Sequence, residues 1–384
     1  MIFCSPWGVG LRLIMFIHSL SGGGAERVTA TLANHWAQQG WLVTIVTAAG
    51  VERDFYELDE RVERIALECD ATSANTWQAL GNNFRRIRAL RRILKEHRPD
   101  AAVAMMTTAN AVLAWASLGL PVVTVGSERI YPPAMPLGRA WSMVRRWSYP
   151  HLSALVAQTR QSAAWLQGNA PAPRIAVIPN PVRFPLPAHE PRLSPTVARE
   201  GTGCSRLLMA VGRLGEQKRF DRLLDAFASV SQAHPDWMLV ILGEGRQRAS
   251  LEDQITSLGL GERVRLPGAV GNVGEWYEAA DIYSLTSRFE GFPNTLIEAL
   301  AHGLPAVAVD CETGPREILR HEVDGLLVPQ DDQKGLVEAL DRIMGDPELR
   351  ARLAERAVEA QGRFAVSSVA VRWEQLFNSL RNGP

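Results

Sequence analysis

The chain has 384 residues, of which 46% are hydrophobic and 21% are charged, and its 41 basic side chains balance its 41 acidic ones. This length predicts two domains of similar size, and the composition is that of a soluble globular protein whose net charge indicates no particular partner. The four cysteines are scattered without metal-binding or CxxC spacing, which argues against a disulfide framework and favours a reducing, cytoplasmic compartment.

The first half of the chain alternates short apolar runs with amphipathic stretches. Residues 1–10 are expected to be an N-terminal extension, because they lack the basic segment of a signal peptide. The alternation that follows predicts a parallel sheet with helices on both faces. Strands are expected at 11–17, 42–47, 62–67, 101–105, 122–125, 154–157 and 175–178. Helices are expected at 26–39, 77–97, 109–118, 137–148 and 160–167.

A loop with three consecutive glycines follows the first predicted strand. The loop begins at His18, and Gly23 and Gly24 precede the predicted helix. Glycines let a ligand approach the backbone closely, and a helix N-terminus favours anionic groups. The loop is neither a GxGxxG fingerprint nor a P-loop. We favour a ligand-contacting loop over a tight turn that binds nothing, because such turns do not need three glycines.

The helix predicted at 77–97 is strongly basic. Between residues 85 and 98 there are seven Lys or Arg and one Glu, and residues 1–178 carry a net charge of +6 against −6 for the remainder. An apolar stripe flanked by cations is typical of helices that bind anionic membrane surfaces or lipid pyrophosphate. The alternative is an ordinary solvated face, and nucleic acid is disfavoured because no recognition fold accompanies the charge. Together with a second group near Trp141 and Trp147, the cations assigned to this contact are Arg85, Arg88, Arg92, Lys95, Arg145 and Arg146.

The uncharged run 101–127 is expected to be a buried strand–helix–strand unit rather than a membrane span, since polar residues and Pro121 interrupt it. Glu128 and Arg129 follow its last strand. Charged residues at the carboxyl end of a strand are expected to face a ligand cleft, with ordinary surface charge as an equal alternative.

The alternation of strand and helix patterns stops at residue 179. Six prolines between 179 and 195 predict a stiff linker at 181–205, between a first domain at 11–180 and a second at 206–364. In the second domain, strands are expected at 207–211, 238–242, 264–266, 282–285 and 306–309. Helices are expected at 218–233, 246–258, 273–279, 294–302, 332–345 and 347–361. A last helix at 366–381, within the segment 365–384, carries Trp373, Leu376 and Phe377 on one face and must pack on another part of the protein.

Two motifs in the second half carry the strongest chemical signal. Gly212-Arg213-Leu214 follows a predicted strand and precedes Lys218, and these two cations could neutralise a diphosphate. Glu290 and Glu298 flank the start of the helix at 294–302, where Phe292, Asn294 and Thr295 lie near free N–H groups. The carboxylates could accept hydrogen bonds from sugar hydroxyls, whereas the structural alternative has Glu290 capping the helix and Glu298 exposed on it. No Asp-x-Asp or catalytic triad spacing is present, so neither a metal nor a cofactor is expected.

These motifs, in this order, resemble those of the retaining glycosyltransferases of family 4, which have the two-domain fold called GT-B. The resemblance covers the chain after residue 10 and includes four further segments. They are 21–27, 243–245, 313–317 and 324–328. It implies an α/β protein with two doubly wound Rossmann-like domains facing across a cleft, and a C-terminal helix that crosses back to the first domain. Many relatives have a histidine in the loop after the strand at 122–125, where this chain has Glu128 and Arg129, and His18 is a candidate substitute.

By this resemblance, Arg213 and Lys218 hold the donor diphosphate, Glu298 the ribose and Glu290 the donor sugar, while Gly212 and the start of the helix at 294 supply further contacts. The implied reaction transfers a hexose or N-acetylhexosamine, with retention, from a UDP-sugar to a lipid-linked oligosaccharide. The enzyme is expected to lie on the cytoplasmic face of the inner membrane and to need no metal. The alternatives are a nucleotide-sugar epimerase of the same fold and a non-catalytic sugar- or lipid-binding scaffold.

Overall fold

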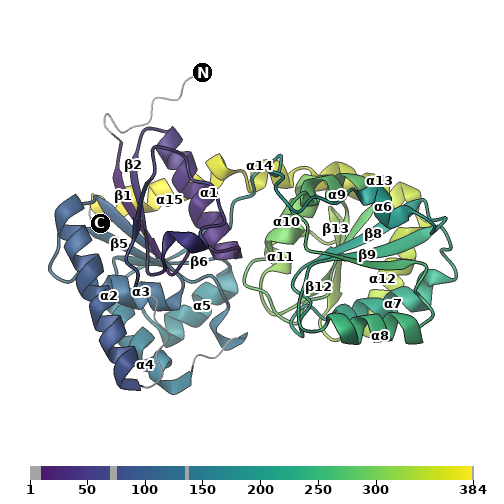
Figure 1. Ribbon diagram of the computed structural model, residues 1–384, viewed down its shortest axis with the longest axis horizontal. Coiled ribbons are helices and arrows are strands. Elements are labelled where there is room, and N and C mark those ends of the chain that lie inside the picture. Colours follow the sequence, from purple (N-terminus) through teal and green to yellow (C-terminus); the bar gives the residue numbers. More distant parts are fainter. Residues whose placement is uncertain (1–9, 70–75, 135–137, 383–384) are drawn as a thin grey trace. The chain divides into compact units, whose positions relative to one another are not determined.

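The computed structural model describes residues 10–69, 76–134 and 138–382, and the chain divides into two compact units. Unit 1 comprises the chain up to Pro181 together with the segment from Val366 onward, and unit 2 is Val182–Ala365. Each unit contains one parallel sheet with helices on both faces (Figure 1), which confirms the predicted fold class. Most of the expected extension, residues 1–9, lies outside the described residues.

The sheet of unit 1 has seven parallel strands in the order β3-β2-β1-β4-β5-β6-β7. Its strands are β1 (Arg12–Ile17), β2 (Leu42–Thr47), β3 (Glu63–Ala66), β4 (Ala101–Met105), β5 (Val123–Ser127), β6 (Ala154–Ala157) and β7 (Ile175–Val177). Its helices are α1 (Gly24–Gln38), α2 (Thr76–His97), α3 (Thr107–Ala116), α4 (Gly138–Ser148), α5 (Arg160–Asn169) and α15 (Val366–Arg381). The uncharged run 101–127 forms β4, α3 and β5, and none of the helices in the described residues has the length and hydropathy that a membrane span requires.

Alternation along the strands builds a core on each face of this sheet. In β1, Leu13 and Met15 join one apolar cluster, while Ile14 and Phe16 join the other. Side chains of successive strand residues point to opposite faces, so a strand covered on both sides is apolar throughout. This explains the continuous apolar runs of the sequence.

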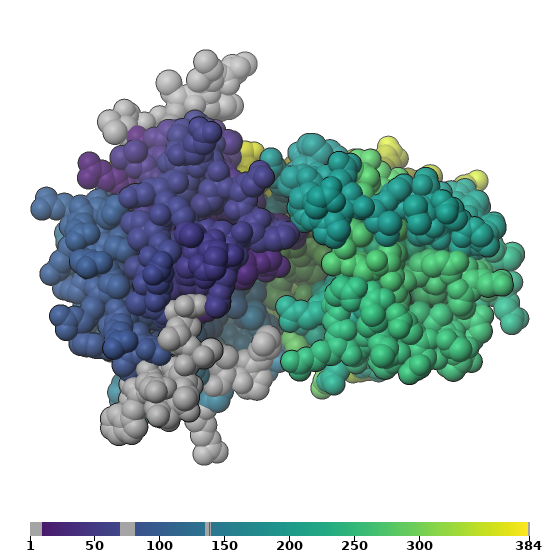
Figure 2. Space-filling model, viewed as in Figure 1, coloured from purple at the N-terminus to yellow at the C-terminus, as the bar shows by residue number. Residues whose placement is uncertain are grey.

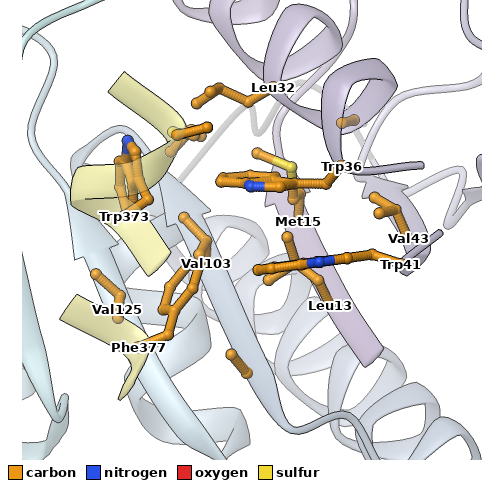
Figure 3. Close-up of a cluster of buried hydrophobic side chains, with 14 of the residues drawn as sticks. Leu13, Met15, Leu32, Trp36, Trp41, Val43, Val103, Val125, Trp373 and Phe377 are labelled. Carbon is orange, nitrogen blue, oxygen red and sulfur yellow. The ribbon is translucent and has the colours of Figure 1, made fainter. Parts of the chain in front are cut away.

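Helix α15 completes the first of these cores. Its Trp373 and Phe377 lie beside the indoles of Trp36 and Trp41 (Figure 3), which stack with their centroids 5.3 Å apart and their planes at 9°. The ring of Phe377 is 6.1 Å from that of Trp36, in a tilted arrangement typical of aromatic pairs. The last helix is therefore an integral part of unit 1.

The sheet of unit 2 has six parallel strands in the order β10-β9-β8-β11-β12-β13. Its strands are β8 (Arg206–Val211), β9 (Trp237–Leu242), β10 (Val264–Gly268), β11 (Ile282–Leu285), β12 (Ala306–Asp310) and β13 (Gly325–Pro329). Its helices are α6 (Pro195–Arg199), α7 (Phe220–Ser231), α8 (Arg248–Ser257), α9 (Val273–Ala279), α10 (Asn294–Ala301), α11 (Pro315–Ile318), α12 (Gln333–Gly345), α13 (Pro347–Ala357) and α14 (Ala360–Arg363).

Two parts of unit 2 differ from the expectation. Strand β13 was not predicted, because its five residues contain both a glycine and a proline. The segment expected as a linker, 181–205, belongs almost entirely to unit 2 and packs on it. It includes α6, and the peptide N–H of Leu193 donates a hydrogen bond to the Asn272 side chain at 3.1 Å. Its Ala198 and Cys204 are buried in the core of the unit.

Candidate functional site

The two sequence motifs of the second half meet at one point of the unit 2 sheet. The strand order runs outward from β8 through β9 to β10 on one side, and from β11 through β12 to β13 on the other. The order therefore reverses between β8 and β11, and in open parallel sheets ligands bind at the carboxyl ends of the strands at such a point. The loops that follow these two strands contain Lys218 and Glu290, respectively.

Hydrogen bonds join these two loops to each other. The Nζ of Lys218 donates to Oε1 of Glu290 at 2.7 Å. The peptide N–H of Arg288 donates to the carbonyl of Gln217 at 2.7 Å, and the Thr286 hydroxyl donates to the carbonyl of Lys218 at 2.9 Å. A cation and a carboxylate from distant parts of the sequence are thus held side by side before any ligand arrives.

The lysine crosses the loop at a glycine. A Cβ at Gly212 would lie 2.8 Å from Cε of Lys218, so any side chain there would displace the lysine. The lysine side chain runs over the bare backbone of the loop and reaches Glu290. The Gly212-Arg213-Leu214 motif and Lys218 are therefore one structural element.

The carboxylate of Glu290 is buried and held from several sides. Besides Lys218, it accepts a hydrogen bond from the Ser287 hydroxyl at 2.6 Å, and its carbonyl accepts one from the Thr313 hydroxyl. Burial, followed by the negative charge of Glu290, raises the pKa of the neighbouring Cys311 thiol to about 12. Only 8% of Glu290 is exposed. The position of the carboxylate is therefore fixed by the protein and does not depend on a ligand.

Arg213 differs from Lys218 in being free. Its side chain is exposed, and in the part of the chain that the structure describes its guanidinium forms no ion pair or hydrogen bond. A planar guanidinium with unoccupied donors is suited to bidentate binding of phosphate oxygens. Lys218 would offer such a ligand a compact positive charge, although its ammonium group is already ion-paired with Glu290.

The start of α10 supplies polar groups beside Glu290. The N-cap residue is Pro293, whose side chain cannot accept a hydrogen bond, so the first N–H groups of the helix have no side-chain cap. Asn294 and Thr295 are half-buried there. The ring of Phe292 packs against Phe364 with centroids 5.9 Å apart, so this residue can serve a ligand only through its backbone.

Glu298 is buried, with 3% exposed, and is not the exposed helix residue of the structural alternative. The Tyr277 hydroxyl lies 3.3 Å from its Oε2 and 3.3 Å from the carbonyl of Thr295. The hydroxyl of Tyr283, another buried tyrosine, donates to the hydroxyl of Thr295 at 2.7 Å. Sequence reasoning missed both tyrosines, because Tyr277 lies in a short helix and Tyr283 in an apolar strand, and only the fold brings them to the start of α10.

The order of the unit 1 sheet reverses between β1 and β4, and the glycine loop follows β1. His18 is exposed at the end of this strand, and Gly23 is the N-cap of α1 with Gly24 exposed beside it. The carbonyl of Gly23 accepts a hydrogen bond from the Tyr56 hydroxyl at 3.0 Å. On the other side of the reversal, Met106 has φ 81°, a conformation that is strained for a residue with a side chain and is found most often at functional sites.

Glu128 lies in a buried polar network at the same edge of the unit 1 sheet. Its carboxylate accepts hydrogen bonds from the hydroxyls of Thr107, at 2.8 Å, and Tyr149. The Nε of Arg145 lies 3.4 Å from Oε1. Burial, followed by the Glu128 charge, raises the pKa of Tyr149 well above its ordinary value, so this hydroxyl remains a donor.

Two assignments from the sequence change as a result. Arg145, assigned to a membrane or lipid contact, is 5% exposed and pairs with Glu128, because α4 turns this arginine toward α3 and the sheet. Arg129 is also buried, at 7% exposed. Its guanidinium donates to the Asn180 side chain at 2.6 Å and lies over the ring of Trp373, and burial lowers its pKa to about 10. Direct contact of Glu128 and Arg129 with an acceptor stays a prediction.

The other surface cations are exposed. Figure 2 shows the side chains of α2, in blue, on the surface of unit 1. Arg85, Arg88, Arg92 and Lys95 of this helix and Arg146 of α4 are exposed. They are accompanied by apolar side chains with large exposed fractions, which are Phe84 at 58%, Met143 at 57%, Val144 at 39% and Trp147 at 67%. Both helices pack against α3. Sequence reasoning missed Met143 and Val144, because the apolar face of α4 could not be told from a buried one.

Comparisons with known protein families match both halves of the chain. Residues 23–181 match the family described as "Glycosyl transferase 4-like domain". Residues 202–360 match the family described as "Glycosyl transferases group 1". The two matches fall on unit 1 and unit 2, respectively.

Curated relatives include enzymes named for polysaccharide synthesis and for sugar transfer to a lipid-linked oligosaccharide. An N-acetyl-D-galactosaminyltransferase of Campylobacter jejuni, named for a diNAcBac-PP-undecaprenol substrate, is 28% identical over 97% of this chain and 99% of its own. An amylovoran biosynthesis glycosyltransferase of Erwinia amylovora is 26% identical over 96% and 99%, respectively. An exopolysaccharide phosphotransferase of Streptomyces coelicolor is 33% identical over 93% of this chain, which spans only 39% of that protein.

Solved structures share the fold of the whole chain. The sucrose-phosphate synthase of Thermosynechococcus elongatus superposes with a TM-score of 0.79 at 20% identity, over 96% of this chain and 98% of that one. The HepE protein of Anabaena, solved with UDP, superposes with a TM-score of 0.76 at 20% identity, over 96% and 100%. These are GT-B glycosyltransferase structures, so the likeness establishes that fold for the chain.

Proposed function

Because this chain belongs to the glycosyltransferases that join a 4-like domain to a group 1 domain, we propose that it moves a hexose or N-acetylhexosamine from a UDP-sugar to the hydroxyl of a lipid-linked oligosaccharide. The observation that carries the proposal is the hydrogen-bonded pair of loops after β8 and β11 in unit 2. In these loops Lys218 is bound to Glu290, and the side chain of Arg213 is free. The named acceptor of the Campylobacter relative supports the lipid-linked acceptor class.

In this proposal the donor lies at the carboxyl ends of β8 and β11. Arg213 and Lys218 bind the diphosphate, and Glu298 accepts hydrogen bonds from the ribose hydroxyls. Glu290 accepts them from the donor sugar, with the start of α10 nearby. The Lys218–Glu290 pair, with only 16% and 10% of the side chains exposed, supports these roles because a partly buried pair is preorganised and needs little rearrangement to bind a ligand.

The chemistry follows from where charge develops. As the bond between the anomeric carbon and the diphosphate oxygen breaks, negative charge grows on the departing UDP, and the two cations stabilise it electrostatically. The acceptor hydroxyl attacks the same face that UDP leaves, which retains the anomeric configuration. Its proton passes to the departing diphosphate. This route requires no covalent bond between the sugar and the protein.

We assign binding of the acceptor, and of the membrane that carries it, to unit 1. The exposed cations of α2 with the apolar side chains Phe84, Met143 and Trp147 form a surface suited to anionic headgroups and the interface below them. We place the protein on the cytoplasmic face of the inner membrane through this surface. Arg145 is not part of it.

A donor screen tests the function. The purified protein is incubated with bacterial membrane extract and a panel of UDP- and GDP-sugars, and both nucleotide release and labelled sugar in the lipid fraction are measured. We expect release and lipid labelling to depend on one UDP-sugar, and NMR of the product to show the anomeric configuration of the donor. Lys218→Ala is the inactive control.

The same screen separates the alternatives. An isomerised sugar formed from the UDP-sugar without acceptor would identify an epimerase. Binding of UDP-sugar or lipid without nucleotide release from any donor would identify a scaffold, and either result would overturn the proposal.

A further inference from the structure

An aromatic ring lies exposed beside the glycine loop of unit 1. Strands β1 and β2 pair in parallel with Ile17 opposite Thr47, so the loops that follow them begin side by side at the carboxyl edge of the sheet. Phe55, in the loop after β2, has 51% of its surface exposed. Its ring lies against Gly22, with ring carbons 3.8 and 3.9 Å from the position that a Cβ on this glycine would take.

The loop that carries this ring is held firmly. The peptide N–H of Phe55 donates to the carbonyl of Leu20 at 2.9 Å. The ring of Tyr56 meets that of Phe55 edge to face at 5.1 Å, and its hydroxyl is bonded to Gly23. On the other side, Asp54 accepts two hydrogen bonds from Arg64, at 2.8 and 2.9 Å. The exposure of Phe55 therefore belongs to an ordered segment.

The local structure keeps this ring at the surface. A phenylalanine left in water forgoes the stabilisation that its burial would bring, and here every adjacent residue is tied down so that the ring stays at the surface. In open parallel sheets ligands bind at the carboxyl ends of the strands, and this ring lies at that edge beside the glycine loop. The polar group next to the ring is the exposed backbone of Gly22, and Gly24 is exposed two residues further along the same loop.

A pyranose ring has the complementary surface. One face of a hexose presents C–H groups, which pack on the face of an aromatic ring, while its rim of hydroxyls needs hydrogen-bonding groups at the side. We propose that Phe55 is a stacking platform for a sugar ring of the acceptor saccharide, with the glycine loop binding the hydroxyl rim. This inference rests on the proposed function and adds the subsite that recognises the saccharide part of the acceptor.

Three variants test the platform. Phe55→Ala removes the ring, Phe55→Trp keeps an aromatic face, and Val51→Ala is the matched control, since Val51 is 56% exposed in the same loop. With lipid-linked acceptor from membrane extract, we expect Phe55→Ala to raise the acceptor KM about five- to tenfold and to leave the donor KM unchanged. Phe55→Trp and Val51→Ala are expected to behave like the wild type.

Binding is measured separately by saturation-transfer NMR with methyl glycosides of glucose, galactose and their N-acetylamino forms, in the presence of UDP. We expect transfer to the ring C–H protons of at least one glycoside, and its loss in Phe55→Ala. The platform is wrong if no glycoside shows this transfer with the wild type, or if Phe55→Ala keeps an acceptor KM within twofold of the wild type. An equal rise in the donor KM would also refute it. Absence of any sugar transfer by the wild type would refute the proposed function instead.

Discussion

The buried pair of Arg145 and Glu128 predicts a large loss of stability when the arginine is removed. The Arg145→Ala change leaves a carboxylate with 2% of its side chain exposed and no cation beside it. Breaking a buried ion pair in this way costs about 3–5 kcal/mol. The hydroxyls of Thr107 and Tyr149 still bind the carboxylate, which favours the lower end, whereas the contact between Arg145 and the ring of Trp165 at 5.5 Å is lost. We expect about 3 kcal/mol.

The assay is differential scanning calorimetry, supported by urea denaturation. In a unit of this size, a loss of about 3 kcal/mol lowers Tm by roughly 6–12 °C. The matched control is Arg146→Ala. That neighbour is exposed and forms no ion pair within the described residues, so its removal is expected to change stability by no more than about 0.5 kcal/mol. The double variant Glu128→Gln with Arg145→Met removes both charges and should recover part of the loss.

The reasoning fails if Arg145→Ala melts within 2 °C of the wild type, because a solvated arginine would give that result. It also fails if Arg146→Ala is as damaging as Arg145→Ala. Equal losses would mean that α4 as a whole is sensitive to substitution and that the ion pair has no special role.

Three further results are expected. Lys218→Ala and Arg213→Ala should each lower turnover about 10²- to 10³-fold without unfolding the protein, as judged by circular dichroism, and wild-type rates in both would contradict their roles. A triple charge reversal to glutamate should lower the affinity for anionic vesicles, measured by sedimentation, at least about 100-fold, because each cation near such a surface contributes about 1 kcal/mol to binding. An unchanged affinity would identify a solvated face. The residues reversed are Arg85, Arg88 and Arg92. Because burial raises the pKa of Cys311 to about 12, its thiol should resist iodoacetamide at pH 8 until the protein is denatured, and labelling of the native protein in mass spectrometry would contradict this.

The predicted elements came close to the structure where apolar periodicity was strong. Each strand of unit 1 was placed within a few residues, because strands buried on both faces have continuous apolar runs. Strand β13 was missed, since its packing on β12 depends on contacts that the local pattern does not contain. The segment at 181–205 looked like a linker because it is rich in proline, but proline does not prevent packing against a neighbouring surface.

Some features of the candidate site were predicted from the sequence and others were not. The sequence order of Lys218 and Glu290 indicated a shared site, and the reversal of strand order explains why they meet. The burial of Arg145 could not be predicted, because the pattern of α4 shows which residues share a face and does not show which face is covered. Tyr277 has no local signal either, since its relation to Glu298 exists only after α9 and α10 pack together.

The position of α15 in unit 1 has a consequence for how the protein is made. The core around Trp36 and Trp41 needs Trp373 and Phe377, which leave the ribosome only after all of unit 2 has been synthesised. During that interval unit 1 exposes an apolar face, and such surfaces bind chaperones or aggregate. Unit 2, in contrast, is continuous in sequence and can fold as soon as it emerges. The order of synthesis is therefore not the order of completion: the half of the protein that is made first is the last to be finished.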